Sequence, residues 1–408
     1  LTTSETQTPI NPTTNGLPMN GRTKPELKTL DLYTNGPEST GGKNEGPSYF
    51  PLREDNGTWS IKEDPAIDAF GSVSFGIGVI DRHSTSNNPC GIYSIYVEIN
   101  GLPFYNMKLD ELDFKTKRYV NAHIDFRYRM EKRVPVHRTY LAPNNQLKIY
   151  DNWQDRTGIL AIEDGKTYNC LYRVTDHFGN TSELKFKLNG KRMEARLKNS
   201  TTAQRTFLPN MKNSFSADGI RFRTPLNAVY DTLEFRYSSI PATENCVSPV
   251  HRICDLGTPL HKYCSISIKV DSSAERFSDR VLIISFDRKG NPVAEGGRFN
   301  NGWVTTRTRS FGDYAVMVDT LNPKVELIDN GSSLNFGDTL KFRIEDELSG
   351  VRTIELSASG KWLLPEWDYK TGIGFYVVDK HFPVGNTTLQ LSAIDKVGNK
   401  TTVKRSYN

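Results

Sequence analysis

The sequence predicts an all-β protein in which antiparallel β-sandwich domains follow one another behind an extended N-terminal arm. Short apolar runs, alternating or continuous, recur along the 408 residues, as they do in half-buried strands. A turn of the form Asp-x-x-Gly-Asn follows such a run three times, and its copies start 111 residues (176 to 287) and 108 residues (287 to 395) apart. That spacing is about the length of one sandwich domain. The copies are Asp176-His-Phe-Gly179-Asn180, Asp287-Arg-Lys-Gly290-Asn291 and Asp395-Lys-Val-Gly398-Asn399.

The chemistry of this turn is that of a tight hairpin. An Asp side chain accepts backbone N–H bonds as an Asx turn, and Gly and Asn tolerate the positive φ that other residues resist. We therefore expect Gly179, Gly290 and Gly398 to hold positive φ, and the Asn that follows each to do so as well.

Length and composition limit the number of domains and the class of protein. A chain of 408 residues suggests two to four domains, and a mean hydropathy of −0.54 suits many half-buried strands. The formal net charge of +5 does not call for nucleic acid, and no apolar stretch is long enough to span a membrane. Five cysteines, an odd number, argue against a disulfide framework. The chain opens without Met, which is expected of a processed or partial product.

The first 65 residues are expected to form an arm or linker. Residues 1–60 hold seven of the 21 prolines and seven of the 31 glycines, which favour loops. One strand is expected at 28–33, and apolar anchors predict that the arm lies along a neighbouring domain.

Two sandwiches are expected next, over residues 66–190 and 191–319. In the first, an Asn-Gly hairpin at Asn100-Gly101 is a strong turn signal. Ile124, Phe126, Tyr128 and Met130 alternate with polar residues, so a strand is expected there.

The third sandwich, 320–408, has the clearest pattern. Seven short strands with turn signals between them in under 90 residues are typical of an immunoglobulin-like sandwich. The expected strands span 324–328, 340–345, 353–357, 362–367, 375–378, 389–394 and 402–405.

Several segments resemble a known family. Thr8-Pro9-Ile10-Asn11-Pro12 resembles the segment that closes the catalytic domain of lysostaphin-type zinc metallopeptidases, the peptidoglycan endopeptidases. Many such proteins of Bacteroidetes-type bacteria carry a β-rich tail after the peptidase, and the runs 76–81, 145–150 and 309–314 resemble such tails. The resemblance implies a C-terminal non-catalytic tail, with the catalytic domain absent from this chain.

The zinc site of that family cannot be carried onto this sequence. The family's site uses a His-x-His motif together with His-x(3)-Asp, and no two of the seven histidines here are two residues apart. We therefore expect no catalytic residue, no cofactor and no enzyme activity in these 408 residues. Zinc would belong only to a missing catalytic domain.

One cluster has the residue types of a structural zinc site, namely His251, Cys254, His261 and Cys264. Cys and His at short spacings suit tetrahedral Zn²⁺. The alternative is a strand on which Cys264 alternates with Ile266 and Ile268, which makes Cys264 a core residue and turns His261 away from it. The strand pattern favours this alternative.

Two further groups have a functional and a structural interpretation. Arg127, Arg129, Arg133 and Arg138 suit an anion-binding patch or the solvated face of a strand, with Asp125 and Glu131 as cross-strand partners. Trp362, Trp367 and Tyr369 suit a platform for sugar rings or packing at the core and edge of a sheet. The structural interpretation is favoured for both groups.

The leading hypothesis is that the chain is a non-catalytic extracytoplasmic scaffold or docking region of a cell-wall metallopeptidase-like protein. In one form of this hypothesis, that protein is a subunit of an outer-membrane assembly. Its expected partners are envelope proteins, with peptidoglycan as a candidate and no nucleic acid, and its expected location is periplasmic or outer-membrane-associated. One alternative is part of an active zinc peptidoglycan endopeptidase whose catalytic domain is missing here. The other is a carbohydrate-binding or adhesion module.

Overall fold

The computed structural model describes residues 21–407 except 37, 43–46, 64–65, 83–87, 152–156, 194–202, 244, 329–330 and 332. The chain is all-β, as predicted, and it forms two compact units. Unit 1 runs up to Lys212 and adds Pro225–Arg236 and Leu256–Lys262, while unit 2 holds Asn213–Thr224, Tyr237–Asp255 and Tyr263–Asn408. In the part of the chain that the structure describes, none of the helices has the length and apolarity that a membrane span requires.

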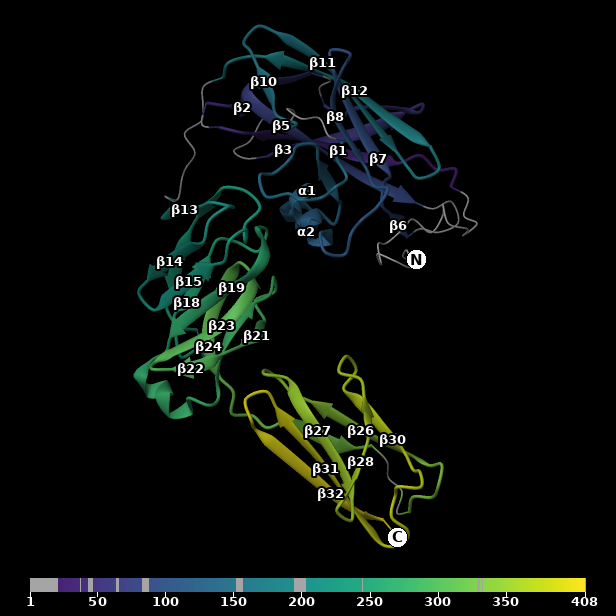
Figure 1. Ribbon diagram of the computed structural model, residues 1–408, viewed down its shortest axis with the longest axis vertical. Helices are drawn as coiled ribbons and strands as arrows, with labels where there is room; N and C mark the ends of the chain where they lie inside the picture. The colour runs from purple at the N-terminus through teal and green to yellow at the C-terminus, as the bar shows by residue number, and fades with distance from the viewer. Residues whose placement is uncertain are drawn as a thin grey trace. The chain divides into compact units, whose positions relative to one another are not determined.

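The sandwich of unit 1 is made of two sheets that share long strands (Figure 1). Ala66–Ala69 of β5 pairs in parallel with β12 in one sheet, and from Val73 onward β5 pairs with β1 in the other. Gly71 lies at this change of sheet with φ 77°. A Cβ there would come within 3.1 Å of the backbone of Ser39, so the crossing requires glycine. The strands are β1 (Glu26–Thr34), β2 (Thr40–Gly41), β3 (Ser48–Asp55), β4 (Thr58–Ile61), β5 (Ala66–Arg82), β6 (Pro89–Cys90), β7 (Ser94–Ile99), β8 (Leu102–Lys108), β9 (Val136–Arg138), β10 (Leu160–Ile162), β11 (Thr167–Thr175) and β12 (Thr181–Gly190).

The expected arm contributes strands to this sandwich. β1, β3 and β4 are hydrogen-bonded members of its sheets, whereas we expected a single strand at 28–33 within a packed arm. β1 is buried on both faces, with Leu30 and Asp31 both fully buried. A strand of this kind lacks the alternation that marks a half-buried strand, which is why its central place was missed. Residues 1–20 and the motif at 8–12 lie outside the described residues.

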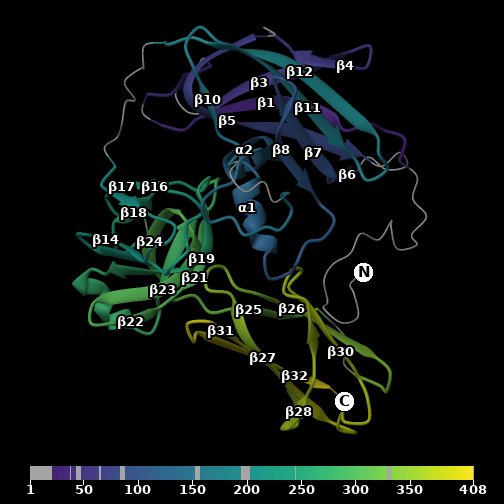
Figure 2. The same ribbon diagram turned by 45° about the horizontal axis from the view of Figure 1, so that its top comes forward.

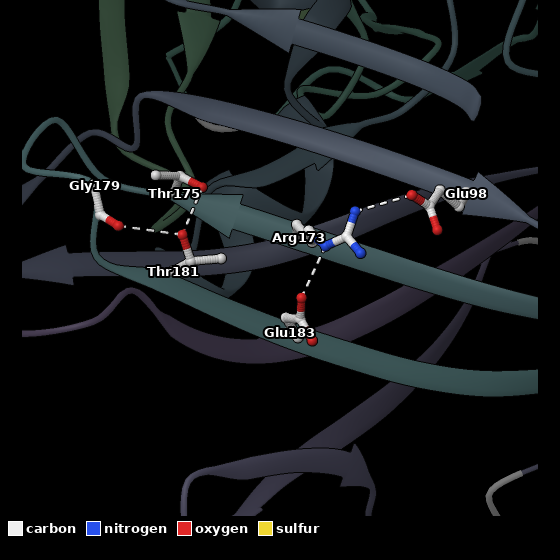
Figure 3. A network of polar contacts seen from close by, with 6 residues as sticks. All are labelled: Glu98, Arg173, Thr175, Gly179, Thr181 and Glu183. Carbon is white, nitrogen blue, oxygen red and sulfur yellow. Dashed lines mark hydrogen bonds and ion pairs between the residues drawn. The ribbon is translucent and has the colours of Figure 1, made fainter. Parts of the chain in front are cut away.

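Polar side chains join the strands around the first turn on the outer face of the sandwich (Figure 3). Arg173 on β11 bonds Glu98 on β7 at 2.9 Å and Glu183 on β12 at 2.8 Å. Cross-strand pairs of this kind support the register of a sheet.

A short helical segment replaces the strand that we expected at 124–130. The helices are η1 (Lys117–Tyr119), α1 (Val120–His123) and α2 (Phe126–Lys132), and α1 and α2 lie beside the strands of unit 1 (Figure 2). Asp125 caps α2 by accepting the backbone N–H of Tyr128 at 2.9 Å, and Arg133 ends it at φ 60°. The expectation of a strand was wrong because these caps decide the local structure over the alternation of apolar residues.

The second sandwich has two five-stranded sheets, β14-β15-β19-β23-β22 and β17-β18-β24-β20-β21, and the separate two-stranded pair β13-β16 belongs to unit 1. Its helix is η2 (Ser272–Phe277). The strands of this span of the chain are β13 (Arg205–Phe207), β14 (Asn213–Ala217), β15 (Ile220–Thr224), β16 (Leu233–Phe235), β17 (Tyr237–Ile240), β18 (Val250–Ile253), β19 (Pro259–Lys269), β20 (Val281–Phe286), β21 (Pro292–Gly296), β22 (Arg298–Asn300), β23 (Trp303–Ser310) and β24 (Gly312–Val318).

The third sandwich has two four-stranded sheets, β25-β26-β30-β29 and β28-β27-β31-β32 (Figure 1). Each of the seven predicted strands has a counterpart, except that the run 362–367 breaks at Pro365 and supplies one short strand to each sheet. The strands are β25 (Lys324–Leu327), β26 (Thr339–Glu345), β27 (Val351–Ala358), β28 (Lys361–Leu363), β29 (Glu366–Trp367), β30 (Ile373–Val377), β31 (Thr387–Asp395) and β32 (Lys400–Tyr407).

The repeated turn forms the same structure three times. Gly179, Gly290 and Gly398 hold φ of 86°, 82° and 101°, the positive values that the sequence predicts. The expectation for the asparagines was wrong, because Asn180, Asn291 and Asn399 are absent from the residues with positive φ. Each Asn instead donates its side-chain Nδ2 to Oδ2 of the Asp that opens the turn, at 2.8, 3.0 and 2.7 Å.

A candidate binding pocket in the first domain

A polar pocket of about 610 Å³ opens within unit 1. Its wall comes from β3, from the helical segment, from β9 and the residues after it, and from residues 229–234, 236 and 257–259, which belong to the same unit. The side chains that give it chemistry are Tyr49, Asp125, Arg127, Arg138, Tyr140, Asp231, Glu234 and Arg236. The pocket therefore offers guanidinium groups, carboxylates and tyrosines together.

Hydrogen bonds fix the stretches 225–236 and 256–262 to the helical segment. Arg118 donates to the backbone carbonyls of Leu260 and His261 at 2.8 and 3.0 Å. Asn144 donates to the carbonyl of Val229 at 2.9 Å, and the Tyr230 hydroxyl donates to the carbonyl of Arg118 at 2.9 Å. Tyr230 also joins a small apolar cluster with Tyr119, Ala122 and Ile149. The wall of the pocket is thus held in place before any ligand arrives.

Arg138 is the central cation of the pocket. One of its guanidinium nitrogens lies 3.8 Å from Asp125 Oδ2, and the group faces the rings of Tyr33 and Tyr140 at 5.6 and 5.8 Å. Tyr33 donates its hydroxyl to the same Asp125 oxygen at 2.9 Å. Burial alone would lower the pKa of Arg138, but Tyr140, Tyr33 and Asp125 raise it above its usual range. The guanidinium is therefore charged at any physiological pH.

Two buried polar atoms of this network have no protein partner. They are Nε of Arg138 and Oδ2 of Asp31. Asp31 lies behind the pocket on β1, fully buried, and burial raises the pKa of its carboxyl well above its usual range. Buried polar atoms without partners are uncommon in folded proteins.

A pair of buried histidines lies beside this network. Nε2 of His123 and Nδ1 of His137 are 2.9 Å apart, and the hydroxyl of Tyr150 lies 3.1 Å from Nδ1 of His123. Burial lowers the pKa of His137 to about 4, with Arg129 contributing, and lowers the pKa of His123 well below its usual range. Both rings are therefore neutral at pH 7.

The four arginines of the basic run separate. Arg127 and Arg129 are exposed on α2, Arg133 forms its C-cap, and Arg138 lies on β9. The interpretation as one solvated strand face was wrong, since α2 interrupts the run. Asp125 does pair with an arginine of the run, but it caps a helix rather than facing it across a sheet.

The structure does not bring the zinc candidates together. His251 is buried with its Nδ1 3.0 Å from the Tyr237 hydroxyl, and burial lowers its pKa to about 4. His261 stacks on Tyr119. Burial raises the pKa of Cys264 to about 12, which disfavours the thiolate that zinc requires. Cys254 is half-buried, and no two of the five cysteines, all within the described residues, form a disulfide.

Asp255 follows His251 by four residues. This is the His-x(3)-Asp spacing of the peptidase family described above, but the His-x-His motif of that family is missing.

The three aromatic residues of the third sandwich also separate. Trp362 and Tyr369 are 65% and 73% exposed, so packing does not account for them. Trp367 packs against the apolar core, as expected.

A shallower hollow of about 460 Å³ lies over β11 and β12, lined by residues such as Cys170 and Phe186. It lacks the charged network of the polar pocket.

Comparisons with known proteins give one family match. Residues 204–319 match the Zu5-like domain family, a span that holds the second sandwich together with residues 229–234, 236 and 257–259 of the pocket wall. No curated protein matches the chain.

Two solved structures are similar at low identity. One is the SGBP-B protein of the Bacteroides ovatus mixed-linkage glucan utilization locus, in complex with a mixed-linkage heptasaccharide, with 8% identity over 92% of this chain and 71% of that one, and a TM-score of 0.16. The other is from a 1.5-MDa bacterial ice-binding adhesin, with 11% identity over 85% of this chain and 93% of that one, and a TM-score of 0.16. At these TM-scores neither likeness indicates what this chain binds.

Proposed function

We propose that the chain is an extracytoplasmic binding protein that holds a charged cell-envelope glycan, such as a peptidoglycan fragment, in the pocket of its first domain. The observation that carries the proposal is the polar pocket of about 610 Å³ around Arg138. Its volume lies in the usual range for ligand sites, about 300–1,000 Å³. No step of catalysis is assigned to it.

The chemistry of the wall favours a ligand that carries charge. Arg127 can pair with a carboxylate in a bidentate manner, while Asp231 can accept from an ammonium or from sugar hydroxyls. Arg236 and Glu234 line the same wall and pair with each other at 3.1 Å. Tyr49 and Tyr140 offer ring faces for the apolar side of a sugar. A peptidoglycan fragment combines sugars with carboxylates and an ammonium, whereas a neutral glucan offers hydroxyls alone.

Co-sedimentation with insoluble polymers tests this proposal. The purified chain should sediment with peptidoglycan and stay in solution with an insoluble neutral glucan. Equal sedimentation with both polymers, or with neither, would contradict a charged ligand in the pocket.

A scaffold role is a second candidate, favoured by the joint between the second and third sandwiches in unit 2. Leu348 and Val397 of the third sandwich pack against a cluster of the second that contains Leu282 and Ala315. Apolar packing at a joint restricts the motion between two domains. Small-angle scattering of residues 320–408 joined to the second sandwich tests it, since a broad range of shapes would indicate a flexible tether. The resemblance to metallopeptidase tails stays a prediction from the sequence.

A further inference from the structure

Three aspartates meet where the chain passes from the second sandwich into the third. Asp319 follows β24, Asp346 follows β26, and Asp395 ends β31. Each offers one carboxylate oxygen, and these oxygens lie within 4.8 Å of one another. Asp319 and Asp395 are buried, and Asp346 is half-buried. Among the described residues, no other group of three or more His, Cys, Asp or Glu side chains has this geometry.

Hydrogen bonds within the turns account for the orientation of each carboxylate. They do not account for the three carboxylates lying together. Asp395 Oδ1 accepts the backbone N–H groups of Val397, Gly398 and Asn399. Asp346 Oδ2 accepts the N–H of Gly350, and Asp319 Oδ2 accepts the N–H of Ser349 at 3.1 Å. In the ion pairs that the structure shows for described residues, none of the three aspartates takes part. The ammonium of Lys396 lies beside Gly350.

The side chain of Asn399 is a fourth polar group at this cluster. Asn399 is 2% exposed, and its Nδ2 donates to Asp395 Oδ2 at 2.7 Å and to the Asp319 carbonyl at 3.0 Å. Its Oδ1 is buried and has no partner. An acceptor without a partner therefore belongs to the side chain that joins Asp319 to Asp395.

The first domain provides an internal comparison. There Asn180 donates to the carbonyl of Gly21 at 3.0 Å, and Ser182 donates to the carbonyl of Pro25 at 2.6 Å. In the third sandwich Asn399 and Thr401 make the same two bonds to Asp319 and Pro323, at 3.0 and 2.6 Å. The same contact thus forms with glycine in the place of Asp319, so the contact itself does not require that carboxylate.

We propose that Asp319, Asp346 and Asp395 bind one divalent cation of the Ca²⁺ type. The donors are all oxygen, which suits a hard cation such as Ca²⁺ rather than zinc. Carboxylates that repel one another when buried become favourable around a cation. Burial raises the pKa of Asp346, and the charges of Asp319 and Asp395 raise it further. Because Asp319 lies in the linker and the other ligands lie in the third sandwich, the ion would stiffen this joint.

The test is isothermal titration calorimetry of the full chain after dialysis against EDTA. CaCl₂ should bind with a stoichiometry of one, and MgCl₂ more weakly. A Ca²⁺ concentration about 100-fold above Kd should shift the unfolding equilibrium of the domain about 100-fold. Absence of both the binding heat and the stability shift would overturn the proposal.

Two variants locate the site. Asp346→Asn keeps an oxygen for the N–H of Gly350 and should weaken Ca²⁺ binding at least tenfold. Asp287→Asn changes an aspartate that likewise accepts the backbone N–H four residues on, at an exposed position outside the aspartate cluster, so it should bind Ca²⁺ like the wild type. Equal binding by Asp346→Asn and the wild type would overturn the assignment. Should Asp346→Asn fail to fold, Asp319→Asn takes its place with the same expected loss, and the wild-type titration still decides whether a site exists.

Discussion

Asn399 holds the backbone carbonyl of Asp319 at 3.0 Å, and this bond joins the last hairpin of the third sandwich to the segment that enters it. The first sandwich repeats the contact between Asn180 and Gly21. In the second sandwich Asn291 is exposed and bonds Asp287. The repeated turn therefore does more than reverse the chain, since in two domains it closes the last strands onto the first.

Removal of the Asn side chain should show the energetic value of this contact. Asn399→Ala leaves the carbonyl of Asp319, a residue that is 3% exposed, without its donor, so the free energy of unfolding should fall by about 1–3 kcal/mol. Asn291→Ala, at the exposed copy, should cost clearly less. Urea unfolding of both variants gives the comparison, and equal losses would contradict a special role for the contact.

Replacement of Gly398 by Val should destabilise the third sandwich through backbone strain. Its φ is 101°, and a Cβ at this position would meet no atom within 4 Å, so strain is the only cost. We expect a loss of about 1–3 kcal/mol. Gly91, where a Cβ also finds open space but no positive φ is present, is the control. Chemical unfolding should place Gly91→Val within about 0.5 kcal/mol of the wild type, and a neutral Gly398→Val would refute the strain argument.

Acid should destabilise the first domain through its buried histidines. The pKa of His137 in the folded chain is about 4, below the value of about 6.5 in an unfolded chain. The unfolded state therefore binds more protons between these values, and stability that is complete above pH 6.5 is lost as the pH falls towards 4. The buried Asp31, with its raised pKa, acts in the opposite direction.

A histidine variant separates these contributions. The fall in Tm between pH 7.5 and pH 5 should be smaller in His137→Gln than in the wild type. His381→Gln, at an exposed position, should leave the fall unchanged. The prediction fails if scanning calorimetry gives the same pH dependence for all three proteins.

The chain alone should not hydrolyse peptidoglycan. This follows from the missing His-x-His motif and from zinc candidates that bind separate partners. Incubation with peptidoglycan, followed by chromatography of the soluble fraction, should show no released muropeptides. Release that a chelator stops would show that a hydrolytic centre exists.

The sequence predicted the parts of the fold that depend on local pattern. The third sandwich has alternating strands and clear turns, and its predicted strands all have counterparts. The prediction failed where a few side chains outweigh the pattern. Asp125 caps a helix within an alternating run, and β1 carries the buried polar side chains Thr29 and Asp31. The cap is a local contact with Tyr128, while the burial of β1 depends on its pairing with β3 and β5.

The pocket was not predictable in the same way. Tyr49, Arg138 and Glu234 come from segments that are far apart in the sequence, and no spacing relates them. The signal that was available was the basic run, and only Arg127 and Arg138 of that run reach the pocket. The aspartate cluster was partly visible, since Asp395 belongs to the repeated turn, but Asp319 and Asp346 meet it only through folding.

Titration calorimetry with a soluble muropeptide tests the central claim most directly, with a neutral gluco-oligosaccharide as the comparison ligand. Arg127 and Arg129 are both exposed on α2, and only Arg127 lines the pocket. We expect the wild type and Arg129→Ala to bind the muropeptide with the same Kd, and Arg127→Ala to bind about tenfold more weakly, which corresponds to about 1.4 kcal/mol. Equal binding by both variants, or tighter binding of the neutral oligosaccharide by the wild type, would contradict the assignment of the pocket.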